Sequence, residues 1–487
     1  MKKISSIIFC LLMAAASAQA QNTFQGGYFM DGYLYAHKMN PALTANRGYL
    51  GIGAGRVGIQ TLSNLGYSTL YYPTGNGKVE SFLSDNISSQ DFLKKIRKNN
   101  TLMADLQVDV LNLGFWTKDD RFHSISISAH VSDGIAAPYD VFRFLKDGAA
   151  GGSGFNLSSL GSNARVYAEV AYGMSAPVTE RLRVGAKVKA LVGMAYAKTN
   201  FNRFDIDLNG QKWQVSTDGT FLQCNIPMGP DSQTIGLMDA VIIDPDNMTD
   251  DNLKPSGFGA ALDLGATWDL FPWLQLSASV TDLGFIRWGK GQTMSASGNW
   301  AYEGFDNISI GGDNDLGDQM EQKLSELDNL IKFHKTGSGS FNDVLPATFY
   351  AGAKFTPVDW FSAGVLGTVR SDGPFSWGEL RGAVNLEPSH WIGFSASAAT
   401  GTLGPKYSAL LNLRLLVFSL FAGVELSSPY LVSQEPSSKF PIRNPDEVFV
   451  VLPRDNMNMD LTVGFNIVFG YTRAQRKALK ASVIVEE

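Results

Sequence analysis

Charged side chains recur at every second position in several segments that alternate between polar and apolar residues. Asp105 and Asp109 share one face of such a segment, and Glu169 and Asp263 lie on the polar faces of two others. Such carboxylates can perform general acid–base chemistry when their environments separate their pKa values. Cations occupy the polar faces of the neighbouring segments: Arg165, Arg183, Lys187 and Lys189. Charge pairing across a polar interior is the simpler interpretation, so we expect these side chains to face a lumen and none to be catalytic.

Other motifs lack the context that their chemistry requires. Gly53–Gly58 fits G-x-G-x-x-G, but a dinucleotide site needs that motif to open a helix after a strand, and here it lies within a strand. Asp205–Gly210 starts like a calcium loop, but Ser216 stands where the bidentate glutamate belongs. We predict a hairpin turning at Asn209–Gly210 instead. Two oxygen-rich segments can be interpreted either as weak calcium sites or as solvated loops: Asp244–Asn247 and Asp313–Asp315.

The sequence predicts no catalytic, metal-binding or cofactor-binding residue. The five histidines lack ligand spacing, and no G-x-S-x-G nucleophile motif occurs. Of the two cysteines, Cys10 lies in the N-terminal leader, which leaves Cys224 without an intramolecular disulfide partner.

The first twenty residues have the pattern of a signal peptide. Lys2 and Lys3 precede an apolar run from Ile4 to Ala16, and Ala18–Ala20 has the A-x-A form of a cleavage site. The expected mature chain leaves the cytoplasm. It keeps 38 of the 40 basic residues, since Lys2 and Lys3 are removed, against 46 acidic ones. This net charge of −8 argues against a nucleic-acid partner.

Period-two alternation predicts the strands that position these side chains. The clearest pair is the hairpin of residues 256–288, whose arms flank the aromatic turn Leu270–Trp273. Its apolar face suits contact with lipid, and its aromatic turn suits a membrane interface. Fourteen strands are predicted: 49–60, 102–116, 122–132, 164–174, 182–190, 258–269, 274–281, 344–356, 360–370, 377–387, 390–400, 405–414, 417–427 and 459–469.

Short and long connections alternate between these strands. Six hairpin turns are short, and five other connections are long: 61–101, 134–162, 199–255, 289–343 and 428–457. This pattern, with an even strand number, is typical of an outer-membrane β-barrel of a Gram-negative bacterium, with short turns and both termini in the periplasm. Tryptophans near the short turns favour an aromatic girdle: Trp116, Trp268, Trp273, Trp360 and Trp391. A large periplasmic β-sandwich or propeller is the alternative.

Three segments depart from the regular alternation of the strands. Asp282 breaks the outward parity set by Leu274 to Val280. Either the strand has left the bilayer, which its position favours, or a bulge near Asp282–Gly284 shifts the register, which would kink the wall and could open it laterally. Helical patterns occur at Gln90–Lys98 and Asp315–Phe333. We expect the second helix to pack on the barrel mouth, with a lid or partner surface as the alternative.

Residues 21–47 alternate little and carry Asn40, Pro41 and Ala42 before the first strand. An irregular segment with Asn-Pro-Ala at this place resembles the hatch of FadL-type long-chain fatty-acid transporters, which are fourteen-stranded barrels. The resemblance implies a diffusion path for hydrophobic molecules through a hatch-plugged barrel. Pro41 restricts the backbone and favours a turn. Three small residues would let the hatch lie close to the wall: Gly51, Gly53 and Gly55.

Longer phrases resemble an uncharacterised Bacteroidetes family of outer-membrane barrels: Tyr35–Ala42, Arg47–Tyr49, Pro138–Phe144 and Val280–Trp288. The resemblance covers nearly the whole mature chain and implies no settled activity. Residues 473–487 depart from it, since the chain continues beyond its last aromatic strand. We therefore expect a signal peptide (1–20), a hatch (21–47), a transmembrane barrel (48–472) and a periplasmic tail (473–487).

Three functions are open for such a barrel, and outer-membrane lipid is an expected partner. The first is passive transport of a hydrophobic or amphipathic small-molecule ligand past the hatch. The second is a non-enzymatic scaffold with a periplasmic or surface protein partner in secretion or surface-protein assembly. A continuous apolar lumen would favour transport, whereas a polar, blocked lumen with ordered loops would favour the scaffold. An outer-membrane enzyme such as a lipase is a third possibility, without a recognisable nucleophile.

Overall fold

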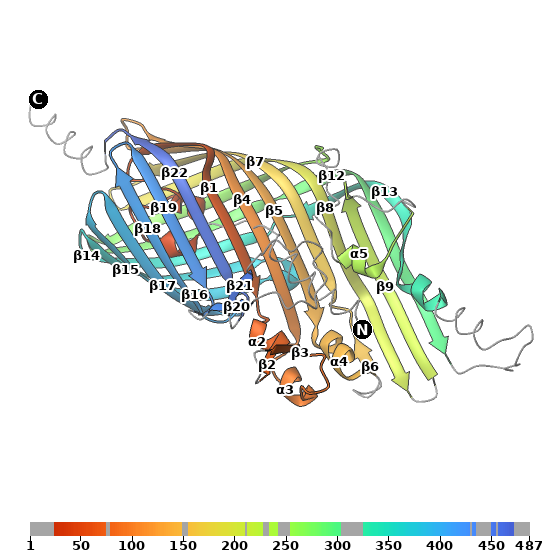
Figure 1. Cartoon of the computed structure of the whole chain (residues 1–487). Coiled ribbons are helices and arrows are strands. Elements are labelled where there is room, and N and C mark those ends of the chain that lie inside the picture. Colours follow the sequence, from red (N-terminus) through yellow and green to blue (C-terminus); the bar gives the residue numbers. More distant parts are fainter. Residues whose placement is uncertain are drawn as a thin grey trace, which may run out of the picture.

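The computed structural model describes residues 24–74, 78–148, 154–209, 212–226, 233–241, 254–302, 325–428, 431–434, 450–453 and 456–471. The predicted signal peptide and tail lie outside these residues, as do Asp244–Asn247 and Asp313–Asp315. The fold is all-β, a closed antiparallel barrel with short helices in its long connections (Figure 1).

Fourteen strands form the wall, which confirms the predicted number and positions. They are β1 (Gly48–Ser63), β4 (Asn99–Trp116), β5 (Phe122–Pro138), β7 (Gly161–Pro177), β8 (Leu182–Asn209), β11 (Gly257–Phe271), β12 (Leu274–Tyr302), β14 (Ala347–Val358), β15 (Phe361–Ser371), β16 (Trp377–Ser389), β17 (Ile392–Gly401), β18 (Lys406–Leu415), β19 (Phe418–Leu426) and β22 (Met459–Phe469). Each pairs antiparallel with its neighbours in this order, and β22 pairs with β1. The ring therefore has no unpaired edge.

Alternation along each strand separates an apolar outer face from a polar inner face. On β7 and β8, Val170 and Val188 are 49% and 56% exposed, whereas the adjacent Glu169 and Lys187 are buried. A closed ladder with an apolar exterior satisfies its own backbone groups, as a membrane-spanning barrel must. Four of the five predicted girdle tryptophans are exposed near short turns: Trp268, Trp273, Trp360 and Trp391.

Trp116 departs from the predicted girdle. It is half-buried, and its indole N–H donates a hydrogen bond to the carbonyl oxygen of Ala45 at 3.0 Å. The ring packs against the aromatic cluster inside the barrel. Proximity to a short turn does not reveal which side of the wall a tryptophan covers.

Two wall strands continue far beyond the barrel. β8 has 28 residues and β12 has 29, and they enclose β9 (Lys212–Cys224), which pairs with both. β13 (Phe333–Val344) pairs with the other side of β12, and β10 (Thr234–Ile235) with β13. A hairpin forms as predicted, but Asn209 belongs to the strand and pairs with Lys212, so the turn is not at Asn209–Gly210; residues 210–211 lie outside the described ranges. The sequence pattern ended β8 too early, at residue 190, because residues 191–197 carry no charged side chain and the polar–apolar alternation is lost there.

Helices and small hairpins occupy the long connections (Figure 1). They are α2 (Tyr67–Leu70), α3 (Ser89–Leu93), α4 (Tyr139–Asp147), α5 (Leu237–Val241), η5 (Gly373–Phe375), β2 (Tyr71–Thr74), β3 (Lys78–Ser81), β6 (Gly154–Asn156), β20 (Leu431–Gln434) and β21 (Val450–Pro453). The helix predicted at Gln90–Lys98 is present but ends at Leu93. Of the helix predicted at Asp315–Phe333, residues 325–331 are helical and 315–324 are not described. No helix in the described ranges is long and apolar enough to cross a membrane.

Candidate functional site in the barrel lumen

The N-terminal segment, residues 24–47, lies inside the barrel. It contains the 3-10 turns η1 (Gln25–Gly27) and η2 (Ala36–Lys38). Its aromatic side chains form one buried cluster with side chains of the wall: Phe24, Tyr28, Phe29, Tyr33 and Tyr35 with Tyr49, Phe122, Tyr350 and Phe421. Such aromatic packing contributes strongly to stability, so the segment is part of the folded core.

Asn40, Pro41 and Ala42 rest on bare backbone. The Ala42 N–H donates to the Asn40 side-chain oxygen at 2.9 Å, which closes a local turn. Gly185 on β8 and Gly265 on β11 lie opposite this turn and pair directly with each other. A Cβ at Gly185 would lie 2.2 Å from the Pro41 carbonyl carbon, and a Cβ at Gly265 would lie 2.0 Å from Asn40 Oδ1. These two glycines let the turn touch the wall.

The glycines predicted for that purpose lie elsewhere. The β1 backbone leaves its ladder with β22 between Leu50 and Arg56. Gly53 has a φ of +83° and nothing within 4 Å of its Cβ position, so it does not contact the segment. The prediction holds for Gly51 and Gly55, since a Cβ at either position would lie 3.4 Å from the Tyr35 hydroxyl, which donates to the Gly55 carbonyl oxygen at 3.1 Å.

Side chains rather than a strand ladder attach the N-terminal segment to the wall. Between Phe24 and Leu43, the backbone N–H groups that form backbone hydrogen bonds donate to carbonyl oxygens of the same segment. Single side-chain bonds then reach opposite sides of the barrel: Tyr28 to Ser277, Lys354 to Asp31, Asn412 to the Gly32 carbonyl, Ser279 to the Met39 carbonyl, and Ser395 to the Gly26 carbonyl. The segment can therefore move without breaking a strand pair.

Lys38 joins the N-terminal segment to a buried charge on β4. Asp109 accepts hydrogen bonds from Lys38 Nζ at 2.7 Å and from Arg56 Nε at 2.8 Å. Ser128 Oγ also donates to Asp109, at 2.7 Å. Removing one partner of such a buried group leaves an uncompensated charge.

His37 is the neutral neighbour of this charge. Burial, together with Lys187 and Lys38, lowers the pKa of His37 well below its usual range. Its Nε2 lies 2.5 Å from the Tyr49 hydroxyl. Lys187 Nζ donates to the His37 backbone carbonyl at 3.4 Å, so the wall holds η2 from both sides.

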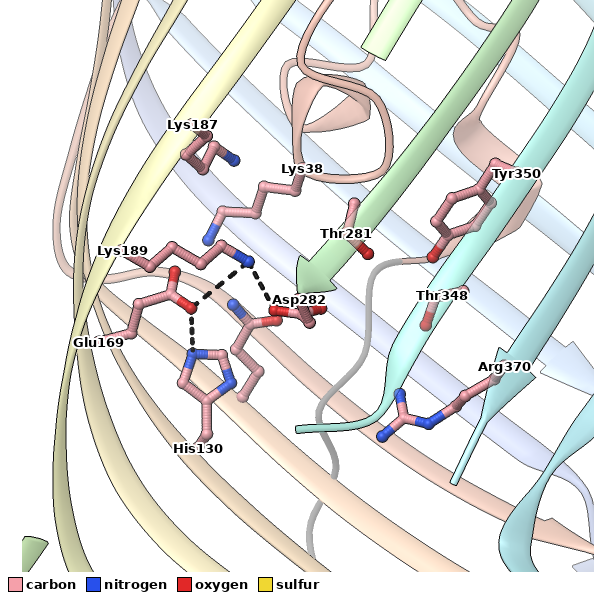
Figure 2. Close-up of a pocket in the computed structure, with 11 residues that line it drawn as sticks. Lys38, His130, Glu169, Lys187, Lys189, Thr281, Asp282, Thr348, Tyr350 and Arg370 are labelled. Carbon is pink, nitrogen blue, oxygen red and sulfur yellow. Dashed lines mark hydrogen bonds and ion pairs between the residues drawn. The ribbon is translucent and has the colours of Figure 1, made fainter. Parts of the chain in front are cut away.

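A second network surrounds Lys189 (Figure 2). Lys189 Nζ lies 2.6 Å from Asp282, 2.9 Å from Asp263 and 3.7 Å from Glu169. Lys187 lies 4.0 Å from Asp263. Four of the six residues expected to face the lumen are thus together: Glu169, Lys187, Lys189 and Asp263. Glu169, Lys187 and Lys189, together with Asp282, border a small cavity of about 50 Å³.

Arg165 and Arg183 lie apart from this network, at opposite ends of the lumen. Arg165 binds Asp343 at 2.6 Å and approaches Asp372 at 3.5 Å, near the long connections. Arg183 binds Asp120 at 2.7 Å, near the short turns. The sequence could not predict this separation. The alternation along a strand indicates which face a side chain is on, but not which residue it meets across the lumen.

Asp282 enters the lumen through a bulge. The β11–β12 register shifts between Leu262 and Leu264, and Asp282 has a φ of +62°. Its backbone N–H donates to Asp263 Oδ1 at 2.8 Å. The bulge interpretation is confirmed, and the favoured one, in which Asp282 keeps its outward parity beyond the bilayer, is wrong, since the bulge turns this carboxylate inwards.

Sequence reasoning missed a third charge network. Arg381 on β16 lies 2.8 Å from Glu379 and 2.6 Å from Glu425, and Lys406 contacts both glutamates. All four are buried. Glu379 and Arg381 stand two residues apart on a predicted strand, so their shared face was a usable signal.

Larger cavities lie at the two ends of the lumen. The cavity beside Arg165, about 710 Å³, lies among the long connections, and one of about 840 Å³ lies among the short turns beside Arg183. The packed centre and the N-terminal segment occupy the space between them. In the described part of the chain, no cluster of histidine, cysteine, aspartate or glutamate could hold a metal ion. The arrangement can admit a solute at either end and oppose its passage at the centre.

These features define a transmembrane β-barrel whose lumen is filled by its own N-terminal segment. The chain belongs to a family of unknown function, DUF5723, whose model matches residues 41–425. This confirms the expectation of an uncharacterised family. No curated protein matches the chain.

Several solved structures are similar. The toluene transporter TbuX of Ralstonia pickettii is 9% identical, with a TM-score of 0.43 over 94% of this chain and 98% of that one. The CymD monoaromatic hydrocarbon channel is 10% identical, with a TM-score of 0.42 over 91% and 94%. A Pseudomonas aeruginosa FadL homologue is 11% identical, with a TM-score of 0.40 over 93% and 100%.

Proposed function

We propose that this protein is a non-enzymatic outer-membrane channel for passive movement of hydrophobic or amphipathic small molecules, with the N-terminal segment as its hatch. The observation that carries the proposal is the attachment of this segment by side chains alone, between two end cavities. A plug without strand pairing can shift while the wall stays closed. The short turns and both termini would face the periplasm, and the long connections would face outwards.

Deletion of residues 21–47, behind an intact signal peptide, tests the hatch. The truncated protein should fold as a barrel and conduct ions in planar bilayers, whereas the full-length protein should conduct little. Heat-modifiable migration on gels would verify that both barrels are folded. Equal conductance of two folded proteins would rule out the hatch.

Transport itself needs a separate measurement. Liposomes that contain the full-length protein should take up a hydrophobic probe such as toluene faster than empty liposomes or liposomes with an unrelated barrel. Indistinguishable uptake would contradict the transport function, whatever the conductance shows.

The scaffold function is the second candidate, because the centre of the lumen is polar and packed. The networks around Asp109 and Lys189 leave a central cavity of only about 50 Å³. If the scaffold function is correct, removal of the extension formed by β9 and the outer parts of β8 and β12 should impair assembly of a complex with a partner protein on intact cells. Under the transport proposal, the same removal should leave hydrophobic uptake in liposomes intact.

A further inference from the structure

The cavity beside Arg165 has a lining that is distinct from the charged centre. Amide and hydroxyl side chains supply most of its polar groups: Asn99, Asn163, Asn200, Asn342, Ser158 and Ser371. Leu160, Leu345 and Phe375 supply apolar surface. Its volume of about 710 Å³ falls within the range usual for small-molecule sites. Such a mixed lining suits a ligand with a polar head and an apolar chain.

The charges in this cavity balance. Two cations, Arg165 and Lys198, and two carboxylates, Asp343 and Asp372, line it. Arg165 already binds Asp343 at 2.6 Å, and Asp343 also accepts a hydrogen bond from the Tyr196 hydroxyl at 2.9 Å. An anionic ligand would have to displace a carboxylate to reach this guanidinium. The lining as a whole therefore carries no net positive charge to attract an anion.

Asn163 provides an unused acceptor. The residue is 6% exposed and lines the cavity, and its side-chain oxygen has no hydrogen-bond partner within the described ranges. Because a buried acceptor without a partner is unfavourable, a hydrogen-bond donor in the cavity would be favoured. A hydroxyl or an amide N–H can donate to it, whereas an ionised carboxylate has no proton to donate.

An apolar surface lies next to this acceptor. Asn163 on β7 pairs in register with Gly134 on β5. The Phe375 ring covers Gly134, since a Cβ there would lie 2.9 Å from the ring. Phe375 is itself 4% exposed and belongs to a buried apolar cluster. The acceptor on β7 and the η5 aromatic ring that covers β5 thus stand side by side.

We infer that this cavity binds an amphiphile whose uncharged head group donates hydrogen bonds, such as a hydroxyl or amide, in preference to a carboxylate. The inference rests on the proposed transport function and names its substrate class. The head lies at Asn163, and the apolar chain lies along Phe375 and Leu345.

Photo-crosslinking of full-length protein in lipid nanodiscs tests this preference. Two probes with the same diazirine-tagged alkyl chain carry either a glucoside or a carboxylate head, and mass spectrometry maps the labelled peptides. The glucoside should label residues 342–345 and 371–375, with octanol but not octanoate as a competitor. Asn163→Leu should reduce this labelling about fivefold to tenfold, as loss of one hydrogen bond predicts. The control Asn202→Leu, an exposed position outside the cavity, should label normally.

Equal or stronger labelling of the cavity by the carboxylate probe would overturn the inference and leave the transport function standing. If neither probe labels the cavity while uptake into liposomes is intact, the inference is likewise overturned and the transport function stands. Absence of both labelling and uptake would overturn the transport function together with the inference. Labelling that persists in Asn163→Leu would exclude Asn163 as the head-group acceptor and overturn the proposed pose.

Discussion

Gly185 and Gly265 pair directly across the β8–β11 ladder and together form the surface on which Asn40 and Pro41 rest. Gly185→Leu should therefore push the N-terminal segment off the wall while the barrel stays closed. Overpacking of this kind typically costs about 1–3 kcal/mol. Protease cleavage within residues 24–47 and single-channel conductance should both increase. Gly382→Leu is the matched control, because a Cβ at Gly382 meets nothing within 4 Å; equal effects of the two variants would contradict the prediction.

Loss of Asp109 should destabilise the protein more than loss of Lys38. Asp109→Asn removes the carboxylate that Lys38 and Arg56 share, and breaking such a buried ion pair costs roughly 3–5 kcal/mol. Lys38→Met keeps the pair of Arg56 with Asp109 and weakens only the attachment of the N-terminal segment. Urea unfolding from lipid vesicles, followed by tryptophan fluorescence, measures the difference. A larger loss in Lys38→Met would show that the network does not depend on Asp109.

Acidification should loosen the N-terminal segment through His37. Its pKa is well below the ordinary value of 6.5 because of burial and the nearby Lys187 and Lys38. After release the imidazole regains a pKa near about 6.5, so the released state binds the proton and the packed state loses stability as the pH falls through that value. Protease access to the segment should rise between about pH 7.5 and about pH 5. His37→Gln should remove most of that rise, and an unchanged response would exclude His37 as its cause.

The alternation of side chains along β7 and β8 should determine which positions are in contact with lipid. Cysteines at Val170 and Val188 should react with a bilayer-soluble reagent, whereas cysteines at Glu169 and Lys187 should not, since the former face outwards and the latter are buried. Val188→Lys should cost roughly 2–4 kcal/mol if the residue lies near the membrane midplane, and less near an interface. Membrane-phase labelling at Lys187 would be incompatible with the barrel in a bilayer.

The wall could be predicted from sequence because each strand repeats one simple alternation. All fourteen strands were found, and the errors concern places where the alternation breaks. Asp282 faces the lumen because a bulge resets the parity, and the end of β8 was missed because residues 191–197 carry no charged side chain to mark the inner face. A bulge depends on partners in the neighbouring strand, such as Asp263 and Lys189 around Asp282, so the local pattern does not contain it.

The interior was less predictable for the same reason. Parity indicated that Arg165 and Lys189 share an inner face, but not that they would bind carboxylates at different depths. Gly185 was indistinguishable from any other small residue of an alternating strand. Its role depends on Pro41, which is 144 residues away in the sequence and in contact only in the folded barrel.

The wall closes where β1 pairs with β22, the first and last strands of the barrel. Tyr35 spans this seam from within: its hydroxyl lies 3.1 Å from the Gly55 carbonyl oxygen on β1 and 2.7 Å from the Asn466 side chain on β22, a residue 431 positions later. A sheet that closed before the N-terminal segment was in place would leave the segment only the barrel's open ends for entry. Capture of the segment while the sheet is still open avoids that obstacle. The earliest residues of the chain therefore complete their packing only when its last barrel strand arrives.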